Sequence, residues 1–337
     1  MKLVIGAGII GSSVVYHLSK LGHRIKWFDP MPHGWFSTSK AAGLILHGKT
    51  GPKYPMTHET IKNIRTLETE LNENLGFVNC GSITSSQDHN KLDGYIDPII
   101  LAGAYKRAST NHISVHKKAE ELILKDNAVI GVRTDHKEYF GDVIDCGGSW
   151  MGNLAIKSNI IQHKSFLPVR SHYFHVNYGS TNIQIPILLM NGLYIRHNQK
   201  NKYIIGIREK ESYYSTDTLP HDWQALDSIK TDDKDEILIE NYDNIKKVFS
   251  DMDKLEITNY TAGFSNYTPD GNYLVGKVCD GLYFAGGDCG SGISSSGGIG
   301  KMVANKQFID EFNPLRFADI PFEKLIANII AVRGKKC

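Results

Sequence analysis

The residues that most constrain the fold of this chain are Gly6–Gly11, which read GAGIIG and form a GxGxxG pattern. The apolar segment Lys2–Ile5 before them is typical of a buried strand, Ser12–Leu21 after them of a helix, and Arg24–Phe28 of a second strand. In such a βαβ unit the first glycine makes the turn, the second admits a pyrophosphate, and the third lets the helix pack on the strand. The sequence therefore predicts a dinucleotide site at its amino end.

An acidic residue completes this prediction. Asp29 follows the second predicted strand, where a carboxylate can accept hydrogen bonds from the hydroxyls of an adenosine ribose. The amino end of the predicted helix supplies free amides and a positive dipole for the phosphates. We expect cofactor contacts from Gly6, Gly8, Ile10, Gly11 and Asp29.

Composition favours a small molecule over nucleic acid as the substrate. The 337 residues are enough for two domains, and 38 basic against 36 acidic side chains give a formal charge of +2.

The five cysteines have no CxxC spacing, so we expect no zinc or iron–sulfur site and a reducing, cytoplasmic location. No apolar run has the length of a membrane span, and the start does not have the pattern of an export signal.

A second glycine-rich segment near the carboxyl end indicates which dinucleotide is bound. Gly287–Ser294 opens a predicted helix that continues through Val303. Its free amides and dipole can face the pyrimidine edge of a flavin and stabilise the negative charge that develops there on hydride transfer. A nicotinamide enzyme needs no such second contact, so the pattern favours FAD.

Other segments are predicted from periodicity alone. Val129–Val132 and Val143–Cys146 are β-branched runs that we expect in the sheet of the βαβ unit. The charged helical pattern over 227–253 is typical of solvated helix faces, with a partner surface as the alternative, and the tail 322–332 of a helix packed on the body. An antiparallel sheet is expected from three strand-like stretches, His172–Val176, Ile185–Met190 and Tyr203–Ile207.

Several segments, in order along nearly the whole chain, resemble the FAD-dependent D-amino acid oxidase superfamily, within it the branch of sarcosine oxidase, glycine oxidase and dimethylglycine dehydrogenase. Besides the GxGxxG pattern, they are Ser37–Leu44, Cys80–Ile83, Asp145–Trp150, Leu167–Arg170, Ala262–Gly263, Thr268–Gly271 and Gly281–Gly287.

The resemblance implies an α/β (α+β) fold with a Rossmann-like FAD-binding domain and a second, mostly antiparallel substrate domain. The first domain would be discontinuous, with residues 1–45, 93–162 and 258–337, and the second would hold 46–92 and 163–257. It also implies oxidation of a C–N bond of a small amine or amino acid by hydride transfer to the flavin.

Cofactor contacts carried over from the family fall in four groups. They comprise the loop residues Ser37, Thr38, Ser39, Lys40, Ala42, Gly43 and Leu44, which pass the pyrophosphate and isoalloxazine; Ala119 at the adenine; Gly147, Gly148, Trp150 and Gly263; and Gly287, Asp288, Gly290, Ser291, Gly292, Ile293 and Ser294 at the flavin C2 carbonyl.

The positions of the family's covalent flavin links differ in this chain. Lys40 stands where one branch has a linking histidine, and Gly263 where another has a linking cysteine. We therefore expect non-covalent FAD.

The substrate clamp also differs. Ser265, Gly290 and Ser294 stand where relatives place cations for a substrate carboxylate. The candidate catalytic residues are Tyr194, which matches a tyrosine facing the substrate, and Arg196 and Arg208, which could supply the missing charge; packing and solvation remain the alternatives.

The electron acceptor and the partner stay open. Ile204 stands where sarcosine oxidase has its oxygen-activating lysine, so an electron-acceptor protein or a quinone is as plausible as oxygen. The alternatives to an amine oxidase are a flavoprotein subunit of a heteromeric electron-transfer dehydrogenase and a hydroxy acid or glycerol phosphate dehydrogenase of the same superfamily. His47 and Lys49 are expected at the surface, with the pocket entrance as the alternative.

Overall fold

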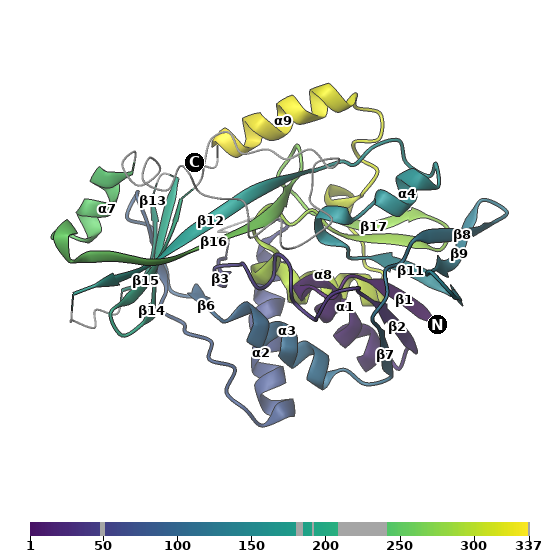
Figure 1. Cartoon of the computed structure of the whole chain (residues 1–337), viewed down its shortest axis with the longest axis horizontal. Helices are drawn as coiled ribbons and strands as arrows, with labels where there is room; N and C mark the ends of the chain where they lie inside the picture. The colour runs from purple at the N-terminus through teal and green to yellow at the C-terminus, as the bar shows by residue number, and fades with distance from the viewer. Residues whose placement is uncertain (48–50, 180–184, 191, 208–240, 336–337) are drawn as a thin grey trace.

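The computed structural model describes residues 1–47, 51–179, 185–190, 192–207 and 241–335 (Figure 1). A six-stranded sheet forms one half, in the order β17-β18-β11-β1-β2-β7. Its strands are β17 (Leu274–Cys279), β18 (Leu282–Gly286), β11 (Asp142–Asp145), β1 (Lys2–Ile5), β2 (Ile25–Phe28) and β7 (His112–Val115). All pairs are parallel except β17 with β18.

Both faces of this sheet are covered. Val4 and Ile144 pack on α1 (Ile9–Lys20) and α8 (Gly292–Asn305), with α3 (Pro98–Ala108) and α2 (Tyr54–Leu71) beyond them. The neighbouring residues Leu3 and Val143 pack on the opposite face, against a small sheet and α9 (Phe322–Lys335). The small sheet has the order β10-β9-β8, with β10 at Glu138–Phe140, β9 at Ala128–Arg133 and β8 at Glu121–Lys125. This alternation is what a parallel sheet buried on both sides requires.

The second large sheet has seven strands in the order β16-β12-β15-β14-β13-β4-β5. Only the β13–β4 pair is parallel. Its strands are β16 (Leu255–Tyr267), β12 (Leu167–Tyr178), β15 (Lys202–Ile207), β14 (Leu193–Gln199), β13 (Ile187–Met190), β4 (Ser82–Thr84) and β5 (His89–Asn90). One face is covered by α7 (Tyr242–Val248). In Figure 1 the long strands β12 and β16 run from this sheet towards the six-stranded half.

Two short pieces connect the halves. β3 (Leu44–Ile45) and β6 (Gly94–Tyr95) form an antiparallel ribbon, and α4 (Asn153–Lys157) follows a 3₁₀ turn after β11. The fold is thus the mixed α/β architecture predicted, with a largely parallel and a mostly antiparallel sheet.

Some predicted elements need correction. The first helix begins at Ile9 rather than Ser12, because Gly8 is its N-cap and the last glycine of the pattern lies within its first turn. Val129–Val132 forms β9 of the small sheet and does not join the sheet of the βαβ unit, since a β-branched run predicts a strand but not its partner. β12 is longer than the predicted His172–Val176. The domain division stays a prediction, and its boundary at residue 258 lies within β16. Residues 227–240 of the charged segment lie outside the described residues.

Candidate functional site

A cavity of about 670 Å³ opens at the carboxyl ends of β1, β2 and β11. This is the edge at which open α/β sheets bind their ligands, and the volume lies in the range of cofactor sites. Backbone from the GxGxxG segment, the 35–38 loop, the 145–150 turn and the start of α8 forms its wall. Segments from both ends and from the middle of the chain therefore enclose one site.

The glycines let the backbone elements meet at this wall. Gly6 has a φ of +96°, and a Cβ there would collide with the carbonyl of Cys146 at the end of β11. A Cβ at Gly11 would collide with the carbonyl of Gly6. A side chain at either position would force the turn away from β11 or from α1.

The 37–44 loop is tied to the first turn of α1. The hydroxyl of Thr38 accepts a hydrogen bond from the Ile9 amide at 2.9 Å, and Thr38 is itself buried. An added Cβ at Gly8 would lie 3.2 Å from that hydroxyl. The dipole of α1 and this loop therefore face the same part of the cavity.

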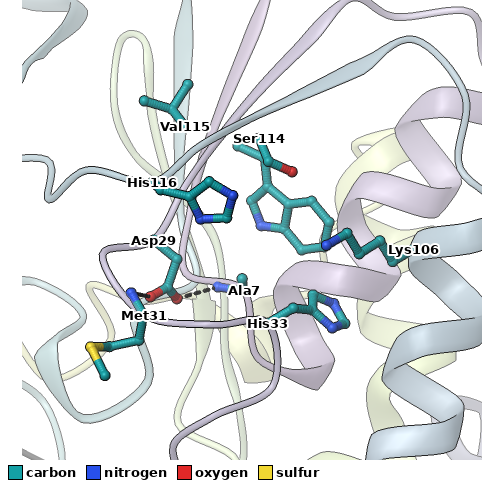
Figure 2. A pocket seen from close by; sticks show the side chains of 9 residues that line it. Ala7, Asp29, Met31, His33, Lys106, Ser114, Val115 and His116 are labelled. Carbon is teal, nitrogen blue, oxygen red and sulfur yellow. Dashed lines mark hydrogen bonds between the residues drawn. The ribbon is translucent and has the colours of Figure 1, made fainter.

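Asp29 is held rigidly at the end of β2 (Figure 2). Its two carboxylate oxygens accept from the amides of Ala7 and Met31, at 2.7 and 2.9 Å. Burial raises the pKa of Asp29 above its ordinary value, against the opposing effect of these two hydrogen bonds. Each oxygen keeps a further lone pair, so the carboxylate is oriented to receive hydroxyl donors.

A small recess of about 10 Å³ adjoins Asp29 and shares Ala7 with the large cavity. Figure 2 shows His116, Lys106 and His33 around it. Burial, with Lys106 nearby, lowers the pKa of His33 to about 4, so its imidazole is neutral at physiological pH. The recess has room for about one water molecule beside the carboxylate.

The start of α8 is docked on the strand that leaves the 37–44 loop. Ser294 donates its hydroxyl to the Leu44 carbonyl at 2.9 Å and accepts the Leu46 amide at 3.0 Å. Asp288, on the cavity wall just before α8, accepts the Asn266 amide at 3.0 Å. The first turn of α8 and β3 are therefore fixed relative to each other beside the cavity.

One face of the seven-stranded sheet lies towards the 37–44 loop. Arg196 on β14 donates from Nε to the Ala42 carbonyl at 2.7 Å, and its guanidinium lies 4.4 Å from the centre of the Tyr95 ring. Its Nη1 donates to the His197 carbonyl and to Asn198, at 3.0 and 3.2 Å. Burial lowers the pKa of Arg196, although the guanidinium remains charged at any physiological pH.

Tyrosines surround this cation. Tyr194 precedes Arg196 by two residues on the same face, and its ring lies across Gly206, where an added Cβ would collide with it. Tyr173 lies beyond Gly206 on the neighbouring strand β12. Arg196 and these tyrosines thus form a polar, largely buried group next to the 37–44 loop.

The structure places the predicted site residues in three groups. Those on the cavity wall are Gly6, Gly8, Ile10, Asp29, Ser37, Thr38, Ala119, Gly147, Gly148, Trp150, Asp288 and Gly292. Those behind or beside it are Gly11, Ser39, Lys40, Ala42, Gly43, Leu44, Gly263, Gly287, Gly290, Ser291, Ile293 and Ser294. Tyr194 and Arg196 lie on the sheet face, and Arg208 and Lys49 lie outside the described residues.

Several wall residues were not predicted. Phe36 packs on the predicted residue Trp150 with the ring centres 4.9 Å apart, and Phe264 and Asn266 reach the cavity from the end of β16. Asn266 is also bonded to Ser149 at 2.9 Å. The alternation of β16 could have identified Phe264 and Asn266 as one face, but only the fold shows that this face turns to the cavity.

The cavity is bordered by a glycine-rich turn at the start of α1, a buried carboxylate at the end of β2 and the start of a second helix, α8. These are the features of a dinucleotide-binding α/β protein. The cavity fits FAD because the residues that line it extend from Asp29 and Ala119 to Gly292 at the start of α8. The family described as "DAO: FAD dependent oxidoreductase" matches residues 3–97 and 89–306. The chain belongs to this family and is an FAD-dependent oxidoreductase.

Relatives agree with this assignment. The chain is 22% identical to "Uncharacterized oxidoreductase YurR" of Bacillus subtilis (strain 168), over 93% of this chain and 97% of that protein. It is 23% identical to 4-methylaminobutanoate oxidase (formaldehyde-forming) of Paenarthrobacter nicotinovorans, over 90% of this chain but only 43% of that protein. Glycine oxidase from Geobacillus kaustophilus superposes with a TM-score of 0.76 at 16% identity, over 94% of this chain and 98% of that one.

In the described residues, no helix is both long and apolar enough to cross a bilayer.

Proposed function

We propose that the chain oxidises a C–N bond of a small amine or amino acid, with hydride transfer to a non-covalently bound FAD. The observation that carries the proposal is the buried cation Arg196, placed among tyrosines and bonded to the loop at Ala42. A buried cation of this kind suits a substrate carboxylate, and it stands in for the cations absent at Ser265, Gly290 and Ser294. The names of the 4-methylaminobutanoate oxidase and glycine oxidase relatives support an amine.

The two large sheets would serve different roles, one in binding FAD and the other in binding the substrate. The six-stranded sheet and its helices would hold the FAD, with the predicted cofactor residues around the cavity. The seven-stranded sheet would supply the substrate side through Tyr194 and Arg196. Protein groups would then bind, orient and desolvate the amine, and bound FAD would supply the hydride acceptor.

Anaerobic reduction of the flavin tests this function. The FAD-loaded protein is mixed without oxygen with N-methylglycine, 4-methylaminobutanoate, L-proline, glycine, a D-amino acid, lactate and glycerol 3-phosphate, and the loss of the yellow absorbance is followed. Bleaching by amines that carry a carboxylate supports the proposal. Bleaching by lactate or glycerol 3-phosphate alone favours a hydroxy acid or glycerol phosphate dehydrogenase, and no bleaching favours a flavoprotein subunit of a larger electron-transfer dehydrogenase.

A further inference from the structure

A buried imidazole lies just beyond the strand that leaves the 37–44 loop. His47 was expected at the surface or a pocket entrance, but its side chain is only 1% exposed. Its Nδ1 lies 3.1 Å from Asp93 Oδ1, and its backbone amide donates to the same oxygen at 2.7 Å. The expectation was wrong because the partner carboxylate comes 46 residues later in the chain.

Asp93 is held as firmly as the imidazole. The hydroxyl of Ser82 donates to Asp93 Oδ2 at 2.6 Å, and the Asp93 side chain is 3% exposed. With Nδ1 directed at the carboxylate, the other ring nitrogen of His47 carries the free lone pair. This Nε2 atom is buried and has no hydrogen-bond partner among the described residues.

A buried polar atom without a partner is costly, by roughly 1–3 kcal/mol. Native proteins keep few such atoms, and those they keep call for a reason. A basic nitrogen oriented by a carboxylate is the arrangement that general bases use. Nε2 of His47 is thus a buried, oriented acceptor with no partner among the described residues.

The sheet brings this acceptor next to Arg196. Ser82 pairs with Ile187, and the Leu188–Ile195 pair puts Ile187 opposite Arg196. Ser82 and Arg196 therefore share one row and one face, two strands or roughly 10 Å apart.

The 93–95 segment spans this separation. Asp93 is bonded to Ser82, and two residues later the Tyr95 ring lies under the Arg196 guanidinium. Burial raises the pKa of the nearby Cys80 thiol, while the charge of Arg196 lowers it and that of Asp93 raises it. The 93–95 segment thus contacts both the imidazole and the cation.

We propose that His47, oriented by Asp93, takes the proton from the substrate's ammonium group while Arg196 binds its carboxylate. This rests on the proposed function, and it deepens it by making the substrate an amino acid that binds as the ammonium form. The N–H bond breaks with its electron pair left on nitrogen, and the proton moves to Nε2. With the nitrogen lone pair free, hydride would leave the α-carbon for the acceptor that bound FAD supplies, and the lone pair would form the C=N bond. The imidazolium returns its proton to water.

Few titratable groups of the described part of the chain face His47. Asp93 lies on one side, and the Tyr54 ring of α2 lies 5.8 Å away, centre to centre. His58 stacks on Tyr54 at 6.5 Å and is exposed. Asp93 is therefore the charged group in direct contact with His47 among the described residues.

The test is the pH dependence of anaerobic flavin reduction by the most active amine of the panel above. For wild type, the rate falls on the acid side as His47 becomes protonated. His47→Gln lowers the rate at neutral pH about 100-fold and removes this limb. Asp93→Asn lowers the rate as well, because the imidazole loses the carboxylate that orients it. The matched control is His58→Gln, which leaves rate and profile unchanged.

A second measurement does not depend on turnover. With the flavin already reduced by dithionite, N-methylglycine or 4-methylaminobutanoate is added to ¹⁵N-histidine-labelled protein, and the His47 ring signals move to imidazolium values. This measurement decides the question if His47→Gln fails to fold. A His47→Gln profile like that of wild type, or His47 signals that do not move, overturns the inference. If no amine reduces the wild-type flavin, the proposed function itself fails.

Discussion

Lys40 and Gly263 lie in direct contact across the two halves of the molecule: a Cβ built on Gly263 would lie 2.8 Å from Cβ of Lys40. These are the two positions that the family resemblance aligns with covalent flavin links, and they meet in space although they are 223 positions apart in the sequence. Neither residue is the histidine or cysteine used for such a link. The 37–44 loop therefore packs against β16 at this contact, and neither residue offers a side chain for a covalent bond to the flavin.

We expect acid precipitation to release the flavin for this reason. Unfolding of the FAD-loaded protein in trichloroacetic acid leaves the yellow colour in the supernatant, where its absorbance equals that of free FAD. A yellow pellet after washing would show a covalent bond and would refute the prediction.

Gly263→Ala is expected to weaken FAD binding. The added Cβ enters the contact with Lys40, so the 37–44 loop must shift away from β16. We expect the dissociation constant for FAD to rise roughly tenfold, equivalent to about 1.4 kcal/mol. Titration of the apoprotein by flavin fluorescence measures it.

Gly103→Ala on α3 is the matched control for that substitution. Its Cβ would meet only the terminal Nη1 of Arg107, at 3.1 Å, and that exposed side chain can move aside. Its dissociation constant should equal that of wild type. Equal values for Gly103→Ala and Gly263→Ala would show that the contact with Lys40 does not shape the flavin site.

Arg196→Lys is expected to destabilise the protein by about 2 kcal/mol, because an ammonium cannot serve the Ala42, His197 and Asn198 oxygens together. The free energy of unfolding in urea measures this loss. Arg133→Lys is the control, since Arg133 is half exposed and its ion pairs with Glu121 and Glu138 are at the surface. A loss of the same size in both variants would contradict a special role for Arg196.

The local part of the site could be predicted from the sequence, and the long-range part could not. The glycine turn and Asp29 lie within one βαβ unit, whose spacing is set by the length of a strand and a helix. The bond from Arg196 to Ala42 spans 154 residues. It depends on how the seven-stranded sheet docks on the loop, which no local pattern encodes.

Burial of polar side chains was missed for the same reason. His47 follows a short apolar run and looks like the start of a surface loop. Its burial depends on Asp93 and Ser82, which reach it only after α2 and the β4–β5 hairpin have folded back. β9 shows the same limit for strands, because its sequence specified a strand but not its sheet.

Stability is expected to fall between pH 6.5 and pH 4 because of His17 on α1. Its Nε2 lies 2.8 Å from Asn63 Nδ2 of α2, and burial, opposed by Glu59 and assisted by Lys301, lowers the pKa of His17 to about 4. The unfolded chain binds the proton near pH 6.5 and the folded one only near pH 4, so acid favours unfolding across that window. The loss reaches about 2 kcal/mol at pH 5 and levels off below pH 4. His17→Gln keeps an acceptor for Asn63 but cannot titrate. Its free energy of unfolding should therefore fall by about 2 kcal/mol less than that of wild type between pH 7 and pH 5. Urea unfolding of both proteins at the two pH values measures the difference, and parallel pH profiles would rule out His17 as the source.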